Sequence, residues 1–159
     1  MSDKQNVSND ETYMVAAMDA ARAAADRGEA PIGAVIVGPD GALLAEAGNG
    51  SIGLCDPTAH AEILALRAAA VASGNYRLTG ASLFVTLEPC AMCAGAISHA
   101  RIGRLVIAAS DPKGGAVWHG PKFFEQATCH WRPEVVQGPF ADESAALLKD
   151  FFKAKRKAR

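Results

Sequence analysis

The sequence predicts an α/β protein with three layers, in which helices cover both faces of a mixed central sheet of about five strands. Two observations carry this prediction. Segments of helical and of extended periodicity follow one another in the order α-β-β-α-β-α-β-β-α, an alternation typical of helices packed on both sides of a sheet. The chain has 159 residues, half of them apolar, which is enough for one domain with a hydrophobic core.

The N-terminal part of the chain is expected to hold a short tail and a first helix. Residues 1–12 are polar and predict a flexible tail, so we place a single domain over residues 13–159. From Tyr13 onward, alanine and methionine recur at helical spacing, and this stripe ends near Gly28.

A hairpin and a second helix are expected next. Residues 31–37 are almost continuously apolar and predict a buried strand, and residues 42–47 predict its hairpin partner across a turn at 38–41. A loop rich in turn-forming residues covers 49–57. A helix is predicted to begin at Thr58 and to end at about Ser73.

The second half of the chain alternates more regularly. In order, we expect a strand over 82–87, a helix over 90–99, a strand over 104–109, a short strand over 134–136 and a helix over about 142–157. Residues 111–132 are rich in glycine and proline and poor in periodicity, which predicts a functional loop. Trp118 in this loop is predicted either to stack on a base or to pack internally.

Composition and charge exclude several classes of protein. The formal net charge is −1 and the isoelectric point is near 6.4, which argues against a general polyanion-coating role but says little about a local basic patch. No apolar run approaches the roughly 20 residues of a membrane helix, and the N-terminus has no secretory signal pattern. We therefore expect a cytoplasmic protein whose four cysteines are thiols or metal ligands.

Three residues form the strongest chemical pattern in the sequence. Cys90 and Cys93 stand three apart at the start of a predicted helix, so both sulfurs are expected on one face of its first turn. A helix N-terminus favours the thiolate, the form that binds metal. His60 begins the preceding helix, and a helix-and-strand return path should bring the two helix starts to one edge of the sheet. We predict that His60, Cys90 and Cys93 hold one zinc ion.

Three protein ligands leave the fourth tetrahedral position for water, which is the catalytic arrangement. Glu62 lies two residues beyond His60 and is predicted to move protons at that water. The pair H-x-E and P-C-x-x-C is the known signature of zinc deaminases. Two alternatives remain open: core-filling roles for these side chains, or a structural zinc site closed by Cys55 or Cys129 in a nucleic-acid-binding module, where Glu62 would have no purpose.

Beyond the metal motif, the chain resembles the bacterial tRNA-specific adenosine deaminase family over residues 13–152. The segments that carry the resemblance are 30–35 (APIGAV), Asn49, 56–63 (DPTAHAEI), 75–78 (NYRL), 85–96 (VTLEPCAMCAGA), 101–102 (RI), 111–114 (DPKG) and 150–152 (DFF). The metal motif alone is shared with guanine, cytosine and cytidine deaminases. The resemblance implies a cytidine deaminase-like fold and conversion of the wobble adenosine, A34, of an arginine tRNA to inosine.

The family also implies roles for individual residues. Asn49 and the backbone N–H of Ala61 would hold the edges of the flipped base, and Asp111 would face the ribose. The walls of the base pocket would be Ile32, Leu87 and Phe151. The alternatives are plain core packing for these apolar residues and a turn before Pro112 for Asp111.

Partners are expected from the resemblance and from the charge pattern. Basic residues gather at the C-terminus, where they would bind the tRNA backbone or simply complement a frayed helix end: Lys153, Lys155, Arg156, Lys157 and Arg159. Arg101 and Lys122 are weaker candidates. The family implies a homodimer, to which residues 90–99 would contribute. A free-base or nucleoside deaminase acting on guanine or cytosine is the competing function.

Overall fold

The computed structural model describes residues 3–158, and side chains from residue 9 onward. A five-stranded mixed sheet has the order β2-β1-β3-β4-β5, with antiparallel pairs among β2, β1 and β3 and parallel pairs among β3, β4 and β5. The elements are α1 (Asp3–Asp26), β1 (Gly33–Val37), β2 (Leu43–Gly48), α2 (Ala61–Ser73), β3 (Ser82–Leu87), α3 (Ala91–His99), β4 (Arg104–Ala109), the 3-10 turn η1 (Phe123–Glu125), β5 (Glu134–Gln137) and α4 (Ala141–Lys157).

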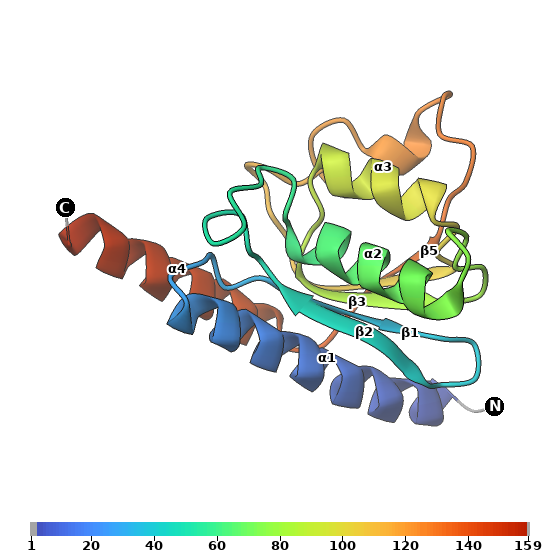
Figure 1. The fold of residues 1–159 in the computed structure, drawn as a ribbon, viewed down its shortest axis with the longest axis horizontal. Helices are drawn as coiled ribbons and strands as arrows, with labels where there is room; N and C mark the ends of the chain where they lie inside the picture. Colours follow the sequence, from blue (N-terminus) through green and yellow to red (C-terminus); the bar gives the residue numbers. More distant parts are fainter. Residues whose placement is uncertain (1–2, 159) are drawn as a thin grey trace.

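Helices cover both faces of this sheet, so the predicted three-layer arrangement is confirmed (Figure 1). Helices α1 and α4 lie together on one face, whereas α2 and α3 lie on the other. The larger core lies beneath α2 and α3, and a smaller one lies between α1 and the sheet. None of the helices in residues 3–158 combines the length and apolar character needed to cross a membrane.

Strands β3 and β4 have the bounds predicted from the sequence. Both are buried along most of their length, as expected for adjacent central strands packed on two sides. The hairpin strands begin one or two residues later than predicted. The predicted irregular region over 111–132 contains one short regular element, η1.

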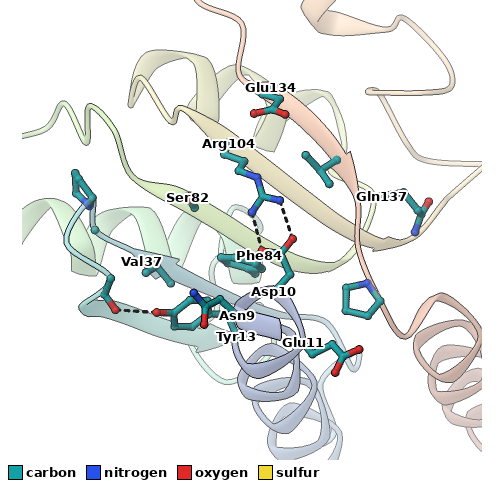
Figure 2. A pocket seen from close by; sticks show the side chains of 15 residues that line it. Asn9, Asp10, Glu11, Tyr13, Val37, Ser82, Phe84, Arg104, Glu134 and Gln137 are labelled. Carbon is teal, nitrogen blue, oxygen red and sulfur yellow. Dashed lines mark hydrogen bonds and ion pairs between the residues drawn. The ribbon is translucent and has the colours of Figure 1, made fainter. Parts of the chain in front are cut away.

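Helix α1 begins at Asp3, ten residues before the predicted start at Tyr13. The residues expected in a polar tail therefore include two turns or more of helix, while residues 1 and 2 lie outside the described part of the chain. The start of this helix shows no apolar stripe, because the residue that it buries, Asp10, is charged. Its carboxylate is buried and receives two hydrogen bonds from Arg104 of β4, at 2.6 and 2.7 Å (Figure 2).

Close packing of α1 on the hairpin depends on small residues. Gly33 of β1 lies so near the helix that a Cβ atom there would sit 1.9 Å from the Ala17 carbonyl oxygen. Ala17 and Ala21 present the matching small face, and both are fully buried. At the far end of the hairpin, the Tyr13 hydroxyl donates to the Gly41 carbonyl at 2.8 Å (Figure 2).

Candidate active site

The three predicted metal ligands lie together beyond the C-terminal end of β3, the central strand of the sheet. His60 and Cys90 are the N-cap residues of α2 and α3, so each helix starts one residue later than the ligand that precedes it. Cys93 projects from the first turn of α3 and is fully buried. Among residues 3–158, the donor atoms of His60, Cys90 and Cys93 form a group in which all lie within 4.8 Å of one another.

The spacing of these atoms fits a tetrahedral ion. The two sulfurs lie 3.6 Å (Cys90) and 3.5 Å (Cys93) from Nδ1 of His60. A tetrahedral zinc ion with Zn–S about 2.3 Å and Zn–N about 2.0 Å separates sulfur from nitrogen by about 3.5 Å. One imidazole and two thiol groups are donors that zinc accepts, and three such ligands leave a fourth position. The residues present therefore fit one zinc ion.

Protonation of the two cysteines is uneven. A hydrogen bond from Cys93 lowers the pKa of Cys90 to about 5, against the opposing effect of burial, which favours the thiolate form that binds metal. The same hydrogen bond, together with burial, raises the pKa of Cys93. A bound cation deprotonates a coordinating thiol, so Cys93 would lose its proton on metal binding.

Glu62 lies in the first turn of α2 and is 4% exposed. Burial raises the pKa of its carboxyl, while hydrogen bonds that include one from the Cys93 thiol act in the opposite direction. The carboxyl is thus hydrogen-bonded to the Cys93 thiol, and it is not one of the three donors of the ligand group.

Asn49 and Ala61 are also brought together. Asn49 lies directly after β2, and its side-chain Oδ1 accepts the Ala61 backbone N–H at 2.7 Å. That N–H is the first of α2, between His60 and Glu62. Within the described part of the chain, no hydrogen bond occupies the Asn49 amide nitrogen. The family resemblance implies that both groups contact the base; in the structure they also bind each other.

Asp111 shapes the loop that follows β4. Its Oδ1 atom accepts the N–H groups of Lys113 at 3.1 Å and Gly114 at 3.0 Å. This is the turn geometry that the sequence left open as an alternative for Asp111. The carboxylate is half-buried, so the turn does not remove it from solvent.

The predicted wall residues are not all gathered in one cavity. Phe151 of α4 and Asn49 line a cavity of about 240 Å³ together with Glu29, Ile52, Phe152 and Lys155. Ile32 packs against the larger core. Leu87 ends β3 and is half-buried. Among the described residues, the lining of this cavity includes neither Ile32 nor Leu87, and it does not include Asp111.

The basic residues expected to bind tRNA form the exposed end of α4. Lys153, Arg156 and Lys157 are exposed, and this end of the helix projects beyond the sheet (Figure 1). Lys155 instead lies over the Phe151 ring at 5.3 Å and donates to the Gly28 carbonyl at 3.2 Å. Arg159 lies outside the described residues.

The remaining candidates are placed elsewhere. Cys55 is exposed, and the Cys129 thiol donates to the Trp131 carbonyl at 3.1 Å, so neither belongs to the described metal-ligand group. Trp118 is half-buried and packs against the larger core. The guanidinium of Arg101 lies over the Trp131 ring at 5.8 Å, and Lys122 is exposed beside η1.

Glu88 is a buried residue of this region to which the sequence assigns no role. Glu88 follows β3 directly, and its side chain has no exposed surface. Burial raises the pKa of its carboxyl, but hydrogen bonds from Asp111, His119, Val117 and Trp118 outweigh that effect and leave the pKa below its ordinary value. The available signal was a charged residue placed between a buried strand and Pro89.

Comparisons with known proteins agree with this site. The family model for the cytidine and deoxycytidylate deaminase zinc-binding region matches residues 7–109. The chain is 54% identical to the tRNA-specific adenosine deaminase of Agrobacterium fabrum over 91% of this chain and 94% of that protein. It is 40% identical to the tRNA-specific adenosine deaminase of Bacillus subtilis over 96% and 94%.

A solved structure from a study of A-to-I editing by tRNA:A34 deaminases at the wobble position has a TM-score of 0.85. It is 54% identical and covers 87% of this chain and 99% of its own. The guanine deaminase of Bacillus subtilis has a TM-score of 0.62 at 31% identity, covering 92% and 93%. With the zinc-ligand geometry and these matches taken together, the chain belongs to the tRNA-specific adenosine deaminase family within the cytidine deaminase-like zinc enzymes.

Proposed function

We propose that this protein is a zinc-dependent hydrolase that converts the wobble adenosine, A34, of an arginine tRNA to inosine. The observation that carries the proposal is the arrangement of His60, Cys90 and Cys93 with the buried Glu62 beside them, in a chain 54% identical to a tRNA-specific adenosine deaminase. The guanine deaminase likeness is weaker in both identity and TM-score.

Bound zinc would act as a Lewis acid that lowers the pKa of water, so that a nucleophilic hydroxide can form near neutral pH. His60, Cys90 and Cys93 would hold the ion. Glu62 would take a proton from the attacking water and deliver protons to ring N1 and to the exocyclic nitrogen. Water adds to C6, the bond from C6 to the exocyclic nitrogen breaks, and ammonia leaves. Adenosine plus water thus becomes inosine plus ammonia.

The other groups would bind the flipped nucleotide, because C6 cannot be reached inside a base stack. The amide nitrogen of Asn49, which donates to none of the described residues, would donate to the edge of the base, while its Oδ1 holds Ala61. Phe151 lines the same cavity as Asn49 and offers an aromatic wall. Ile32 and Leu87 would complete the apolar surroundings, and Asp111 would face the ribose hydroxyl that distinguishes RNA from DNA.

The tRNA backbone is assigned to the basic end of α4. Lys153, Arg156 and Lys157 are exposed near the cavity that Phe151 lines, and phosphate contacts raise affinity without reading sequence. A cytoplasmic location is part of the proposal, because free thiols such as those of the metal site persist in a reducing compartment.

A homodimer is also part of the proposal. Helices α2 and α3 border an apolar groove of about 360 Å³, which includes Ile63, Leu66, Tyr76 and Ala96. Tyr76 is 67% exposed, and the family resemblance implies a second copy of the chain as the occupant. Sedimentation of Ala96→Glu against the unsubstituted protein tests this: a dimer that dissociates on substitution supports it, and a monomer in both contradicts it.

The function itself is tested with an arginine tRNA anticodon stem-loop that carries A34. Purified protein loaded with zinc should convert A34 to inosine, as read by sequencing. Guanine, cytosine and cytidine are assayed in parallel for ammonia release. Absence of inosine together with ammonia from a free base or nucleoside would replace this proposal with the competing one.

A further inference from the structure

The Glu88 carboxylate binds the loop over residues 111–119, which follows β4 next to the metal ligands. It accepts hydrogen bonds from four backbone N–H groups and one imidazole. Oε1 accepts from Asp111 N at 3.0 Å and from Nδ1 of His119 at 2.8 Å. Oε2 accepts from the backbone N–H groups of Val117 at 3.2 Å, Trp118 at 3.0 Å and His119 at 3.2 Å. One side chain therefore holds both ends of residues 111–119.

The backbone comes so close to this carboxylate that only glycine fits at one point. A Cβ atom on Gly115 would lie 2.2 Å from Oε2 of Glu88 and 2.5 Å from the Asp111 carbonyl oxygen. Gly115 is buried and its N–H donates to that same carbonyl at 2.9 Å. The loop is thus wrapped around the carboxylate.

The wrapped loop is also joined to the segment that carries the metal ligands. Glu88 stands two residues before Cys90, and the Ala116 N–H donates to the Pro89 carbonyl at 2.9 Å. The Glu88 N–H in turn donates to the Ala109 carbonyl at the end of β4, at 2.8 Å. The loop, the end of β4 and the start of α3 are therefore held to one another through residues 88–89.

Both oxygens of Glu88 accept hydrogen bonds, so the side chain at this position must offer two acceptor atoms. A glutamine has the same shape, but its amide nitrogen would face N–H groups on one side of the loop. Buried N–H groups without an acceptor are costly, so the loop would move to find other partners. An anionic acceptor is the residue type that this arrangement requires.

We propose that Glu88 is a positioning residue for the substrate, which fixes the loop over residues 111–119, and with it Asp111, relative to the metal ligands. This inference rests on the proposed function, since Asp111 is the group assigned to the ribose. Glu88 acts through the loop and does not touch the reacting atoms. A misplacement of about 1 Å in such a loop can reduce kcat/KM by about 10²-fold.

The test compares Glu88→Gln with a matched control, Asp10→Asn. Asp10 is also a buried carboxylate in a bidentate contact, but it binds Arg104 at the start of β4, beside the other end of β3 from Glu88. Four quantities are measured for each zinc-loaded protein: zinc content, amide hydrogen exchange, and kcat and KM on the A34 stem-loop. Gly115→Ala is a second variant, which displaces the carboxylate while leaving Glu88 in the chain.

Glu88→Gln is expected to keep one zinc per chain, to exchange faster at Asp111 and at residues 117–119, and to raise KM about tenfold or more, with kcat/KM falling about 10²-fold. Gly115→Ala should reproduce the pattern if Glu88→Gln does not fold. Asp10→Asn should exchange faster near α1 and keep the KM of the unsubstituted protein.

Two results would overturn the inference. One is faster loop exchange with an unchanged KM, because the loop would then not position substrate. The other is an equal rise of KM in Asp10→Asn, because general loss of stability would then explain the effect. If the unsubstituted protein forms no inosine, the proposed function itself fails, and that failure is seen before any variant is compared.

Discussion

Asn49 and Ala61 are joined by a 2.7 Å hydrogen bond in which the Asn49 Oδ1 atom accepts the first backbone N–H of α2. The bond connects the loop after β2 to the residue between a metal ligand, His60, and the buried Glu62. It leaves the Asn49 amide nitrogen for another acceptor. A single side chain can therefore order the start of α2 and contact substrate, and the two tasks can be separated by substitution.

Asn49→Asp keeps the acceptor and removes the donor, so we expect it to retain stability while kcat/KM on the A34 stem-loop falls by about 10²-fold, the effect of losing a buried base contact. Asn49→Ala removes both, and the unpaired N–H should cost a further 1–3 kcal/mol or so of stability. Thermal unfolding and steady-state kinetics measure the two effects. Full activity in Asn49→Asp would show that the amide nitrogen does not bind the base.

Glu62 and Cys93 are expected to separate metal binding from proton transfer. Glu62→Gln should keep one zinc per chain, since the carboxyl is not a ligand, and should lose activity by about 10²-fold or more, because general acid–base transfer contributes that much. Cys93→Ala should lose zinc, activity and thermal stability together. Metal analysis of the purified variants decides the point, and a zinc-free Glu62→Gln protein would contradict the assigned role.

The parts of the fold that could be predicted are those whose signals are local. Strands β3 and β4 are apolar runs with clear breaks, and their bounds were predicted correctly. The metal ligands were found because residue type and spacing together define the donor set. Helices α2 and α3 were predicted to start slightly early, because His60 and Cys90 are N-cap residues without a side-chain capping bond.

The parts that were missed depend on distant contacts. Helix α1 begins early where Asp10 meets a residue 94 positions away in the chain, and no periodicity shows that. Glu88 holds its loop by accepting hydrogen bonds from backbone N–H groups 23 to 31 residues further along the chain. Backbone donors have no signature in the sequence. The way in which Glu88 holds residues 111–119 can therefore be seen only in the folded chain.

The contact between Asp10 and Arg104 should be a measurable part of the stability. Asp10→Ala leaves the Arg104 guanidinium without its bidentate partner in a largely buried position, and we expect a loss of about 2–3 kcal/mol in the free energy of unfolding. The control is Asp19→Ala, whose contact with Arg22 is 3.4 Å long and mostly exposed. Exposed pairs contribute about 1 kcal/mol or less, so equal losses in urea denaturation would contradict the prediction.

Acid sensitivity should include a contribution from Asp56. The side-chain hydroxyl and the backbone N–H of Thr58 donate to this carboxylate at 2.7 and 2.9 Å, and Arg67 lies 3.6 Å away, so its pKa is lowered. A lowered pKa gives stability that is present above the ordinary carboxyl value and is lost as pH falls through the lowered value.

Asp56→Asn removes this contribution, so its melting temperature should lie below that of the unsubstituted protein at neutral pH. The gap should close as pH falls below about 4. Thermal unfolding of both proteins at several pH values provides the comparison, in which acid loss of zinc affects both alike. A gap that widens on acidification would be evidence against the assignment.

The basic end of α4 gives a prediction about salt. Lys153, Arg156 and Lys157 are exposed, and each phosphate contact releases counterions on binding. Replacing all three by alanine should weaken stem-loop binding, and should make the slope of log affinity against log salt shallower by about 2, since each contact to a single strand contributes about 0.7. Binding is measured by fluorescence anisotropy between low and physiological salt.

The control for this triple variant is Arg22→Ala. Arg22 is exposed on α1, where it pairs with Asp19 at 3.4 Å, so the substitution removes a positive charge without changing α4. Its salt slope should equal that of the unsubstituted protein. An unchanged slope in the triple variant would mean that these residues only complement the helix dipole, and the tRNA backbone would then have to bind elsewhere on the surface.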